Sequence, residues 1–304
     1  MEKSLSKNKK NREAKNERAF FAFLSPWLIG FLLFTLIPMA FSLFFSFNKV
    51  SVNNLEGLKW VGLDNFSLIL RGDSVFWVAL RNTFIFAALR VGVGVIIAIL
   101  VALLLNHNFR LKRLLRTLIF IPALLPIVGS AIVWRQLFSN DFSLFNYLLN
   151  FIGISPVSWM SWNNAMGSIL LMSIWCGIGP TMIIIHASLQ NVPQSLVEAA
   201  EIDGANSFVK FKNITLPMIS PTIFYIVITG IIGALQAFVE MQLLNGNSES
   251  TTTLTMQVMS NVFSGFGLGY ASAMSWIIFV IVGVLTAIFF KVINRAVYYE
   301  NKVD

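Results

Sequence analysis

Residues 198–221 read EAAEIDGANSFVKFKNITLPMISP and form a polar segment between two long apolar runs. Its first part, residues 195–202, consists of good helix formers, and Pro193 just before it suits a first helical turn. Asp203 and Gly204 then supply a turn. The segment is therefore expected to form a helix, a hinge and a second helix.

The two helices expected in this segment differ in pattern. Glu198 and Glu201 are expected near the N-terminal end of the first helix, where carboxylates interact favourably with the helix dipole. After the hinge, apolar residues recur at every third position, at Phe208, Phe211 and Ile214. This pattern predicts a second helix with an apolar stripe, which Pro217 stops. An ordered polar insert of this kind is expected to contact a partner.

The composition of the chain is typical of a membrane protein. Of its 304 residues 56% are hydrophobic and 12% are charged, and the mean hydropathy is +0.74. Apolar runs long enough to cross about 30 Å of hydrocarbon as a helix lie at residues 20–47, 83–105, 115–138, 166–188, 222–244 and 271–291. No alternating pattern typical of a barrel strand accompanies them. We therefore expect an all-α polytopic membrane protein with six transmembrane helices.

The distribution of positive charge predicts the orientation of these helices. Residues 1–18 form a basic tail that is expected to stay in the cytoplasm, ahead of a transmembrane domain at residues 19–304. The other cations on the same side are Arg110, Lys112, Arg113, Arg116, Lys210, Lys212, Lys291, Arg295 and Lys302. Fewer cations fall outside, namely Lys49, Lys59, Arg71, Arg81 and Arg135. The asymmetry favours an N-in, C-in topology with residues 198–221 in the cytoplasm.

Several kinds of chemistry find no support in the sequence. The net charge of +8 is better explained by cytoplasmic loops than by nucleic-acid binding. Cys176 is the single cysteine, and His107 and His186 have no companions at metal-ligand spacing, so we expect no disulfide and no metal site. A G-x-x-x-x-G-K-[ST] loop is also absent. No catalytic residue is expected, and the chain is not expected to hydrolyse ATP.

Short motifs relate the chain to a known family. Glu198-Ala199-Ala200, Asp203-Gly204-Ala205, Leu216-Pro217 and Pro221 resemble the EAA loop of permease subunits of ATP-binding-cassette importers. The flanking ASLQNVPQSLV and ITLPMISPT resemble the carbohydrate-uptake branch. The stretches SPWLIGFLLFTLIPMAFSLFFSF, WVGLDNF, GYASAMSWIIF and RAVYYE are similar to the first of the two permeases of sugar importers. The likeness extends over nearly the whole chain and implies the fold of a type I importer permease.

The resemblance implies that separate subunits form the membrane path and hydrolyse ATP. The coupling loop, at about residues 190–221, would sit in a groove of a separate ATPase, with Glu198 near an arginine of that partner and Gly204 allowing the bend. The coupling residues carried over are Glu198, Ala199, Ala200, Asp203 and Gly204. ATP and Mg would be bound by the partner ATPase. The implied assembly has a second related permease, two ATPase subunits and an external binding protein, in a bacterial or archaeal cell membrane.

The fourth apolar run contains candidates for the substrate path. Gly177 and Pro180 lie in WCGIGPTM, where the proline is expected to kink the helix near Cys176 and to free a backbone carbonyl for a hydroxyl, a water or a sugar. Trp175 is the first residue of that stretch, and Ser173 lies two residues before it. Trp175 could stack on a sugar ring or pack against lipid, and the sequence leaves both readings open.

The fifth apolar run contains a second set of candidates. Gly230, Gly233, Gln236 and Glu240 follow one another at spacings of three and four, which would place them along one face of a helix. The small residues are better explained by close helix packing than by a substrate wall. A charge at membrane depth needs compensation, so Arg90 could pair with Glu240 or line the cavity. A structural ion pair is the favoured interpretation.

Two other function classes compete with an importer permease. An ion-coupled secondary transporter predicts inverted repeats and paired broken helices, and a membrane enzyme predicts clustered acids, bases or metal ligands. Neither signature is visible. The aromatic external segment 139–165 is expected to contain a short helix at the membrane interface, which is compatible with docking of a binding protein.

Overall fold

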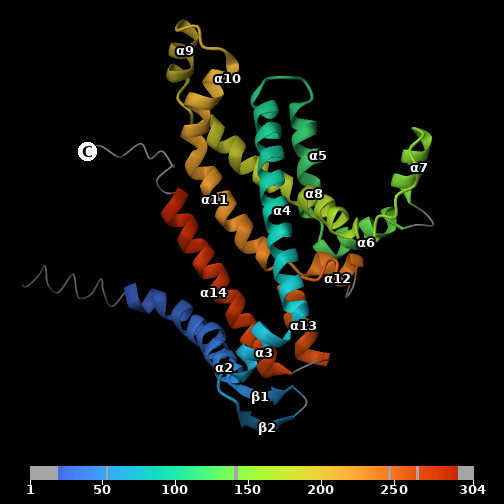
Figure 1. Cartoon of the computed structure of the whole chain (residues 1–304). Helices are drawn as coiled ribbons and strands as arrows, with labels where there is room; N and C mark the ends of the chain where they lie inside the picture. The colour runs from blue at the N-terminus through green and yellow to red at the C-terminus, as the bar shows by residue number, and fades with distance from the viewer. Residues whose placement is uncertain (1–19, 53, 140–142, 246–247, 265–266, 294–304) are drawn as a thin grey trace, which may run out of the picture. The chain divides into compact units, whose positions relative to one another are not determined.

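The computed structural model describes residues 20–52, 54–139, 143–245, 248–264 and 267–293. Two compact units are present, Met1–Leu68 with Asn261–Trp276 and Ile69–Ser260 with Ile277–Asp304. The basic tail expected at residues 1–18 lies outside the described residues. Within them helices dominate (Figure 1), which confirms the all-α fold class. A short hairpin, β1 (Asn48–Ser51) with β2 (Asn54–Trp60), is a local exception.

Five of the helices are long and apolar enough to cross a membrane. They are Phe20–Ser46, Ser74–Asn106, Ala165–Gln190, Ser207–Leu235 and Leu268–Lys291. A sixth span is present if two shorter helices joined by a sharp bend are counted as one. The order of the expected spans is thereby confirmed and their number is five or six, but the third and fifth differ from the expectation.

The third span is broken in the middle. α5 (Lys112–Leu124) and α6 (Ile127–Leu137) meet at an angle of 101°. Leu125 between them is extended, with φ −78° and ψ 136°, because the ring of Pro126 disfavours helical geometry in the residue before it. The expectation of one continuous helix over residues 115–138 was wrong, since it overlooked this proline.

The fifth span ends earlier than expected. α11 (Leu216–Leu235) stops before Gln236, and a separate α12 (Val239–Asn245) follows. Carbonyl groups freed at the break accept hydrogen bonds from threonine hydroxyls: Thr255 donates to Leu235 at 3.4 Å and Thr253 donates to Ala237 at 3.0 Å. The expectation of one helix over residues 222–244 was therefore wrong.

Two π-helical turns occur just before prolines. η1 (Leu32–Leu36) precedes Pro38, and η2 (Phe211–Thr215) precedes Pro217 by the same spacing. A proline has no N–H and its ring crowds the preceding turn, and a wider turn relieves that crowding. The helix therefore continues through Pro217 and runs from Ser207 to Leu235.

The first unit joins the first span to the hairpin. α2 (Ile37–Ser46) continues the helix after η1 and leads into β1. The side-chain amide of Asn65, in α3 (Asp64–Gly72), donates to the carbonyl of Ser46 at 2.8 Å and to that of Asn48 at 3.0 Å. This clamp holds the end of the span against the hairpin.

The second unit is built around three long helices. α4 (Ser74–Asn106) packs along α8 (Ala165–Gln190) and α11, while α5 packs on α8. Asp73 caps α4 by accepting from the backbone N–H of Phe76 at 3.0 Å. The largest core side chains that these helices bury together are Phe86, Leu105, Ile169, Met172, Met182, Ile185 and Ile219. This packing fixes the walls of the cavity described below.

The remaining helices are short or continue from one unit into the other. α7 (Leu144–Phe151) confirms a short helix in the segment 139–165, capped by Ser143, whose hydroxyl accepts from the N–H of Asn146 at 3.1 Å. α13 (Leu254–Ser264) and α14 (Leu268–Ile293) complete the described part of the chain.

Candidate functional site

The polar segment forms a helix, a tight turn and a second helix, as expected. α9 (Gln194–Ile202) is closed by a Schellman motif: the N–H of Ala205 donates to the carbonyl of Ala200 at 2.9 Å, and that of Gly204 to Glu201 at 3.0 Å. Gly204 has φ +77°, a conformation that residues with a Cβ rarely adopt. The helical pair α9 and α10 thus depends on a glycine at this position.

The turn is completed from its other side. The side chain of Asn206 caps α10 (Ser207–Lys210) by accepting from the N–H of Val209 at 2.9 Å. Lys210 forms an ion pair with Glu201 across the turn at 2.5 Å. These contacts hold the two helices in one arrangement.

The expected position of the acids in the first helix was wrong. α9 has no acidic residue in its first turn. Glu198 lies in the middle of this nine-residue helix, and Glu201 lies in its last turn, where Lys210 compensates its charge. Among the residues that the structure describes, Glu198 has no hydrogen-bond or ion-pair partner, so its carboxylate is free to meet another protein.

The surface of this segment is open to a partner. Glu198, Ala199, Asp203 and Gly204 are exposed, and Ala200 is half-buried. Two large apolar side chains flank the turn: Ile202 is 88% exposed and Phe208 is 70% exposed. Apolar side chains presented at the tip of a polar segment favour a protein contact over solvent.

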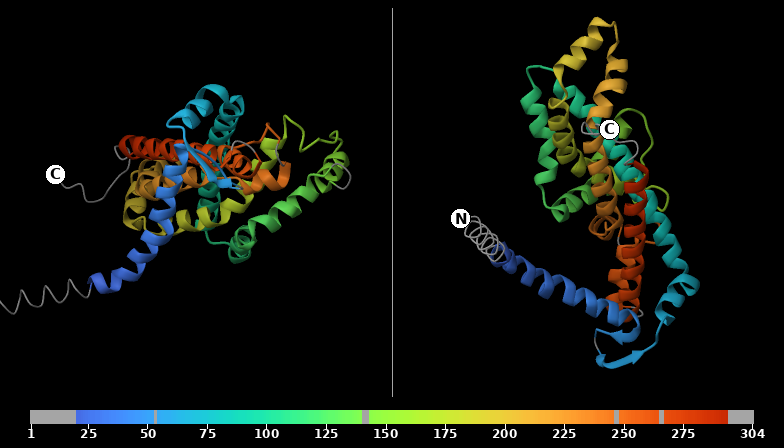
Figure 2. Two further views of the ribbon diagram at one scale, coloured as in Figure 1. Left: turned by 90° about the horizontal axis from the view of Figure 1, so that it is seen from below. Right: turned by 90° about the vertical axis from the view of Figure 1, so that its left-hand side faces the viewer.

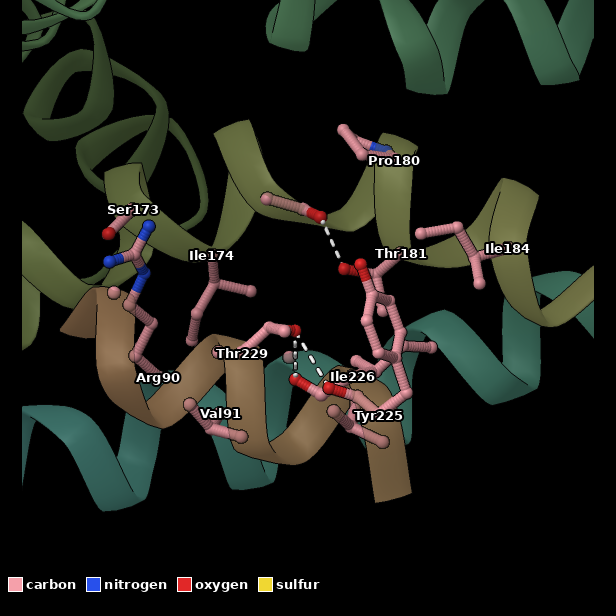
Figure 3. Close-up of a pocket in the computed structure, with 15 residues that line it drawn as sticks. Arg90, Val91, Ser173, Ile174, Pro180, Thr181, Ile184, Tyr225, Ile226 and Thr229 are labelled. Atoms are coloured by element: carbon pink, nitrogen blue, oxygen red, sulfur yellow. Dashed lines mark hydrogen bonds between the residues drawn. The ribbon is translucent and has the colours of Figure 1, made fainter. Parts of the chain in front are cut away.

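A cavity of about 300 Å³ lies between α4, α8 and α11 (Figure 3). α4 contributes Arg90, Val91, Gly94 and Val95; α8 contributes Ser173, Ile174, Gly177, Pro180, Thr181 and Ile184; α11 contributes Tyr225, Ile226, Thr229, Gly230 and Gly233. Figure 3 shows Arg90 and Ser173 at one end of it and Thr181 and Tyr225 at the other. The cavity is thus mainly apolar, with polar side chains at both ends and the hydroxyl of Thr229 between them.

Arg90 and Glu240 form the ion pair that the sequence favoured. Nη1 of Arg90 lies 4.0 Å from Oε1 of Glu240, and the hydroxyl of Ser173 lies 3.5 Å from the same oxygen. Glu240 is 6% exposed and is not part of the cavity lining, whereas Arg90 lines the cavity. The buried carboxylate of Glu240 therefore forms an ion pair with Arg90, whose guanidinium faces the cavity.

The structure brings only part of the predicted path together. Arg90, Ser173 and Gly177 line the cavity. Trp175 instead packs edge-on against Trp134, with ring centroids 5.5 Å apart. Gln236 is exposed at the C-terminal end of α11, outside the cavity lining, because the helix breaks there.

Hydroxyl groups of the cavity wall were missed by the sequence analysis. Thr181, Tyr225 and Thr229 line the cavity. Thr181 follows the proline of WCGIGPTM and donates to the carbonyl of Gly177 at 2.9 Å, and Thr229 donates to the carbonyl of Tyr225 at 2.8 Å. The spacing of Tyr225, Thr229 and Gly233, four residues each, is the helical signal that could have identified this face.

The glycines of α8 have two different roles. A Cβ added to Gly179 would lie 2.8 Å from the carbonyl oxygen of Ile119, so this glycine allows α5 to approach closely. A Cβ added to Gly177 would meet no atom within 4 Å, since Gly177 opens on the cavity. One glycine of α8 therefore allows close helix packing, and the other leaves space in the cavity.

Membrane-spanning helices around a polar-ended cavity, joined to a protruding helical pair, define a membrane component of a transporter. A family model described as the inner membrane component of binding-protein-dependent transport systems matches residues 94–298. The chain belongs to that family and is a multi-pass permease subunit.

Curated relatives cover nearly the full chain. The probable ABC transporter permease protein YesP of Bacillus subtilis (strain 168) is 37% identical over 97% of each chain. The trehalose/maltose transport system permease protein MalF of Thermococcus litoralis is 30% identical over 96% of this chain and 98% of that protein.

Solved structures share the fold. A chain of a bacterial alginate ABC transporter, in complex with a periplasmic protein that holds an alginate pentasaccharide, superposes with a TM-score of 0.82 at 22% identity. The match covers 94% of this chain and 97% of that one. A second structure of a bacterial ABC transporter for alginate import superposes with a TM-score of 0.79 at 22% identity. The match covers 93% of this chain and 98% of that one.

Proposed function

We propose that this chain is one of two permease subunits of an ATP-driven importer for a sugar or a sugar derivative. The observation that carries the proposal is the α9–α10 pair, with its free Glu198 and exposed apolar tip, on a permease chain without a nucleotide-binding loop. Such a pair is suited to receive force from a separate subunit. ATP and Mg are then bound by that partner ATPase, and this chain is not an enzyme.

The substrate class rests on the relatives. Their names include permeases for trehalose and maltose, for sn-glycerol-3-phosphate in Yersinia pestis and for sulfoquinovosyl glycerol in Agrobacterium fabrum. All of these solutes carry two or more hydroxyl groups. The polar ends of the cavity, Arg90 with Ser173 and Thr181 with Tyr225, can exchange hydrogen bonds with such a solute in place of water.

The coupling role is assigned to Glu198, Ala199, Ala200, Asp203 and Gly204. Glu198 would meet a cation in a groove of the ATPase, and the small side chains of Ala199 and Ala200 would let the helix enter closely. The chain offers one such helical pair. Because ATP sites of this superfamily resemble sandwiches of two subunits, two permease segments are needed to move both halves.

The proposed assembly contains a second related permease, two ATPase subunits and an external solute-binding protein in a bacterial or archaeal cell membrane. In it, residues 19–304 act as one transmembrane domain behind a cytoplasmic tail at residues 1–18. Binding of loaded binding protein and ATP would favour the outward-facing state, and hydrolysis would return the pair inward. The sugar passes between the two permeases during this cycle.

Reconstitution tests this assembly directly. The chain is placed in vesicles with the ATPase and the binding protein, with or without the second permease, and sugar uptake and ATP hydrolysis are measured. We expect sugar-stimulated hydrolysis and uptake only with both permeases. Equal activity without the second permease would refute the heterodimer, and sugar uptake without any ATPase would refute the importer itself.

The topology provides an independent prediction. A reporter that is active only in the cytoplasm should work when fused after Lys112 or Lys210 and should be silent after Lys59 or Asn150, because cations accumulate on the cytoplasmic side. Enzymatic activity of each fusion, normalised to its expression, is the measurement. Activity after Lys59 with silence after Lys210 would reverse the orientation.

The cavity is tested by filling it. Gly177→Leu should lower the uptake rate about tenfold or more without lowering assembly, because its side chain enters open space inside the cavity and leucine is a better helix former than glycine. Gly92→Leu is the matched control: a Cβ there also meets no atom within 4 Å, but Gly92 does not line the cavity. Equal uptake by the two variants would show that the solute does not pass through this cavity.

A further inference from the structure

The turn between α4 and α5 concentrates positive charge without compensation. Four cations lie within seven residues: Arg110, Lys112, Arg113 and Arg116. No Asp or Glu occurs in the sequence between Asp73 and Asp141. In the described part of the chain the ion pairs are Arg90 with Glu240 and Lys210 with Glu201, so none of the four cations has a carboxylate partner there.

One of these cations is fixed in place. Nη2 of Arg116 lies 2.8 Å from Nε2 of His186 on α8. An arginine only donates hydrogen bonds, so His186 accepts at Nε2 and is the neutral tautomer. A neutral imidazole orients the guanidinium but does not cancel its charge. Arg116 is therefore an anchored cation that still lacks a counter-charge.

The anchored guanidinium is only partly satisfied by hydrogen bonds. Nε of Arg116 is buried and has no hydrogen-bond partner among the described residues. Unsatisfied buried donors are costly and uncommon in folded proteins. The uncompensated charge of the four cations thus favours an anionic ligand at this turn.

An exposed apolar stripe runs down α5 from the cationic turn. Leu111, Leu114, Leu118 and Ile121 follow at spacings of three, four and three, and each is more than 40% exposed. The stripe is roughly 15 Å long at 1.5 Å per residue, about half of the hydrocarbon thickness of a bilayer. Arg110 and Arg113 each precede a stripe residue by one position, so charged and apolar groups are adjacent.

We propose that the α4–α5 turn and the stripe of α5 form a site for an anionic phospholipid of the cytoplasmic leaflet. Arg110, Lys112 and Arg113 bind the phosphate, and Leu114, Leu118 and Ile121 contact an acyl chain. The turn lies at the same end of the second unit as α9 (Figures 1 and 2). A free phosphate would use the cations but not the stripe, and for this reason the lipid is the favoured source.

Native mass spectrometry of the purified importer complex tests the site. The complex is equilibrated with equal amounts of phosphatidylglycerol and phosphatidylcholine of the same acyl chains, and the ratio of bound lipids is measured. We expect phosphatidylglycerol to be preferred, and Arg113→Gln to lower the ratio about fivefold, the effect of about one cation at a membrane surface. Arg113 is exposed, and its side chain forms no hydrogen bond or ion pair among the described residues.

Control variants separate this site from general attraction to positive charge. Lys291→Gln removes an exposed cation from the last turn of α14 and should leave the ratio unchanged. Leu114→Ser with Leu118→Ser should weaken retention of both lipids. Equal retention of the two lipids by the native complex, or an equal loss in Lys291→Gln, would overturn the proposal.

Two further arms distinguish other occupants. Inorganic phosphate is added in excess: unchanged lipid retention supports the lipid site, and displacement of phosphatidylglycerol by phosphate alone assigns the cations to a free anion instead. The permease pair is also compared with and without its ATPase subunits. Loss of the bound lipid when the ATPase is present would assign the turn to a protein contact and overturn the lipid site.

Discussion

Gly204→Val should lower ATP-driven uptake by about tenfold or more while the protein remains inserted in the membrane. Gly204 has φ +77°, and a β-branched residue in that region is strained by about 1–3 kcal/mol. A Cβ at this position would meet no atom within 4 Å, so the strain comes from the backbone alone. A fraction of the variant molecules then loses the Schellman motif that ends α9. The apparent affinity for the ATPase falls in proportion to the molecules that keep the turn.

The matched control at this position is Gly204→Asn. Asparagine tolerates the left-handed region better than other residues with a Cβ, so this variant should retain most of the uptake. Uptake into vesicles and co-purification of the ATPase are measured for both. Normal uptake and normal co-purification in Gly204→Val would show that the turn is not needed for coupling.

Arg90→Leu should reduce the amount of assembled permease about tenfold or more. It leaves the carboxylate of Glu240, which is 6% exposed, without its cation. Breaking a buried pair from one side costs about 3 kcal/mol. Glu240→Leu should reduce the amount of assembled permease less than Arg90→Leu does, because the remaining Arg90 faces the cavity and can be hydrated there.

The double variant Arg90→Leu with Glu240→Leu separates stability from transport. Removing both charges should restore assembly, since an apolar pair often replaces a buried ion pair without loss. Uptake should remain low if the guanidinium binds the solute. Thermal unfolding of the purified complex and the uptake rate are the two measurements. A double variant less stable than Arg90→Leu would exclude the ion pair as the cause.

Much of the architecture could be predicted from local sequence. Long apolar runs specify membrane helices because lipid offers the backbone no hydrogen bonds, and this reasoning located the spans. The turn at Asp203-Gly204 and the helix before it follow from residue type alone. The pairing of Arg90 with Glu240 could be inferred because a charge at membrane depth requires a partner.

Breaks within the membrane helices are harder to predict from local sequence. Hydropathy averages over a window and is insensitive to one proline, so the bend at Pro126 was missed. The end of α11 has no proline or glycine at Gln236. It depends on Thr253 and Thr255, which are distant in sequence and satisfy the freed carbonyl groups. A break of this kind requires contacts that only the folded chain supplies.

The sequence by itself determined the family, the order of the spans and the helix–turn–helix of residues 194–210, because each depends on residues that are neighbours along the chain. Only the tertiary structure decided which polar side chains share a cavity. Trp175 and Ser173 are two residues apart on α8, yet Ser173 faces the cavity and Trp175 packs on Trp134. Successive helical positions are about 100° apart, and the packing of α4 and α11 against α8 selects which of them faces inward.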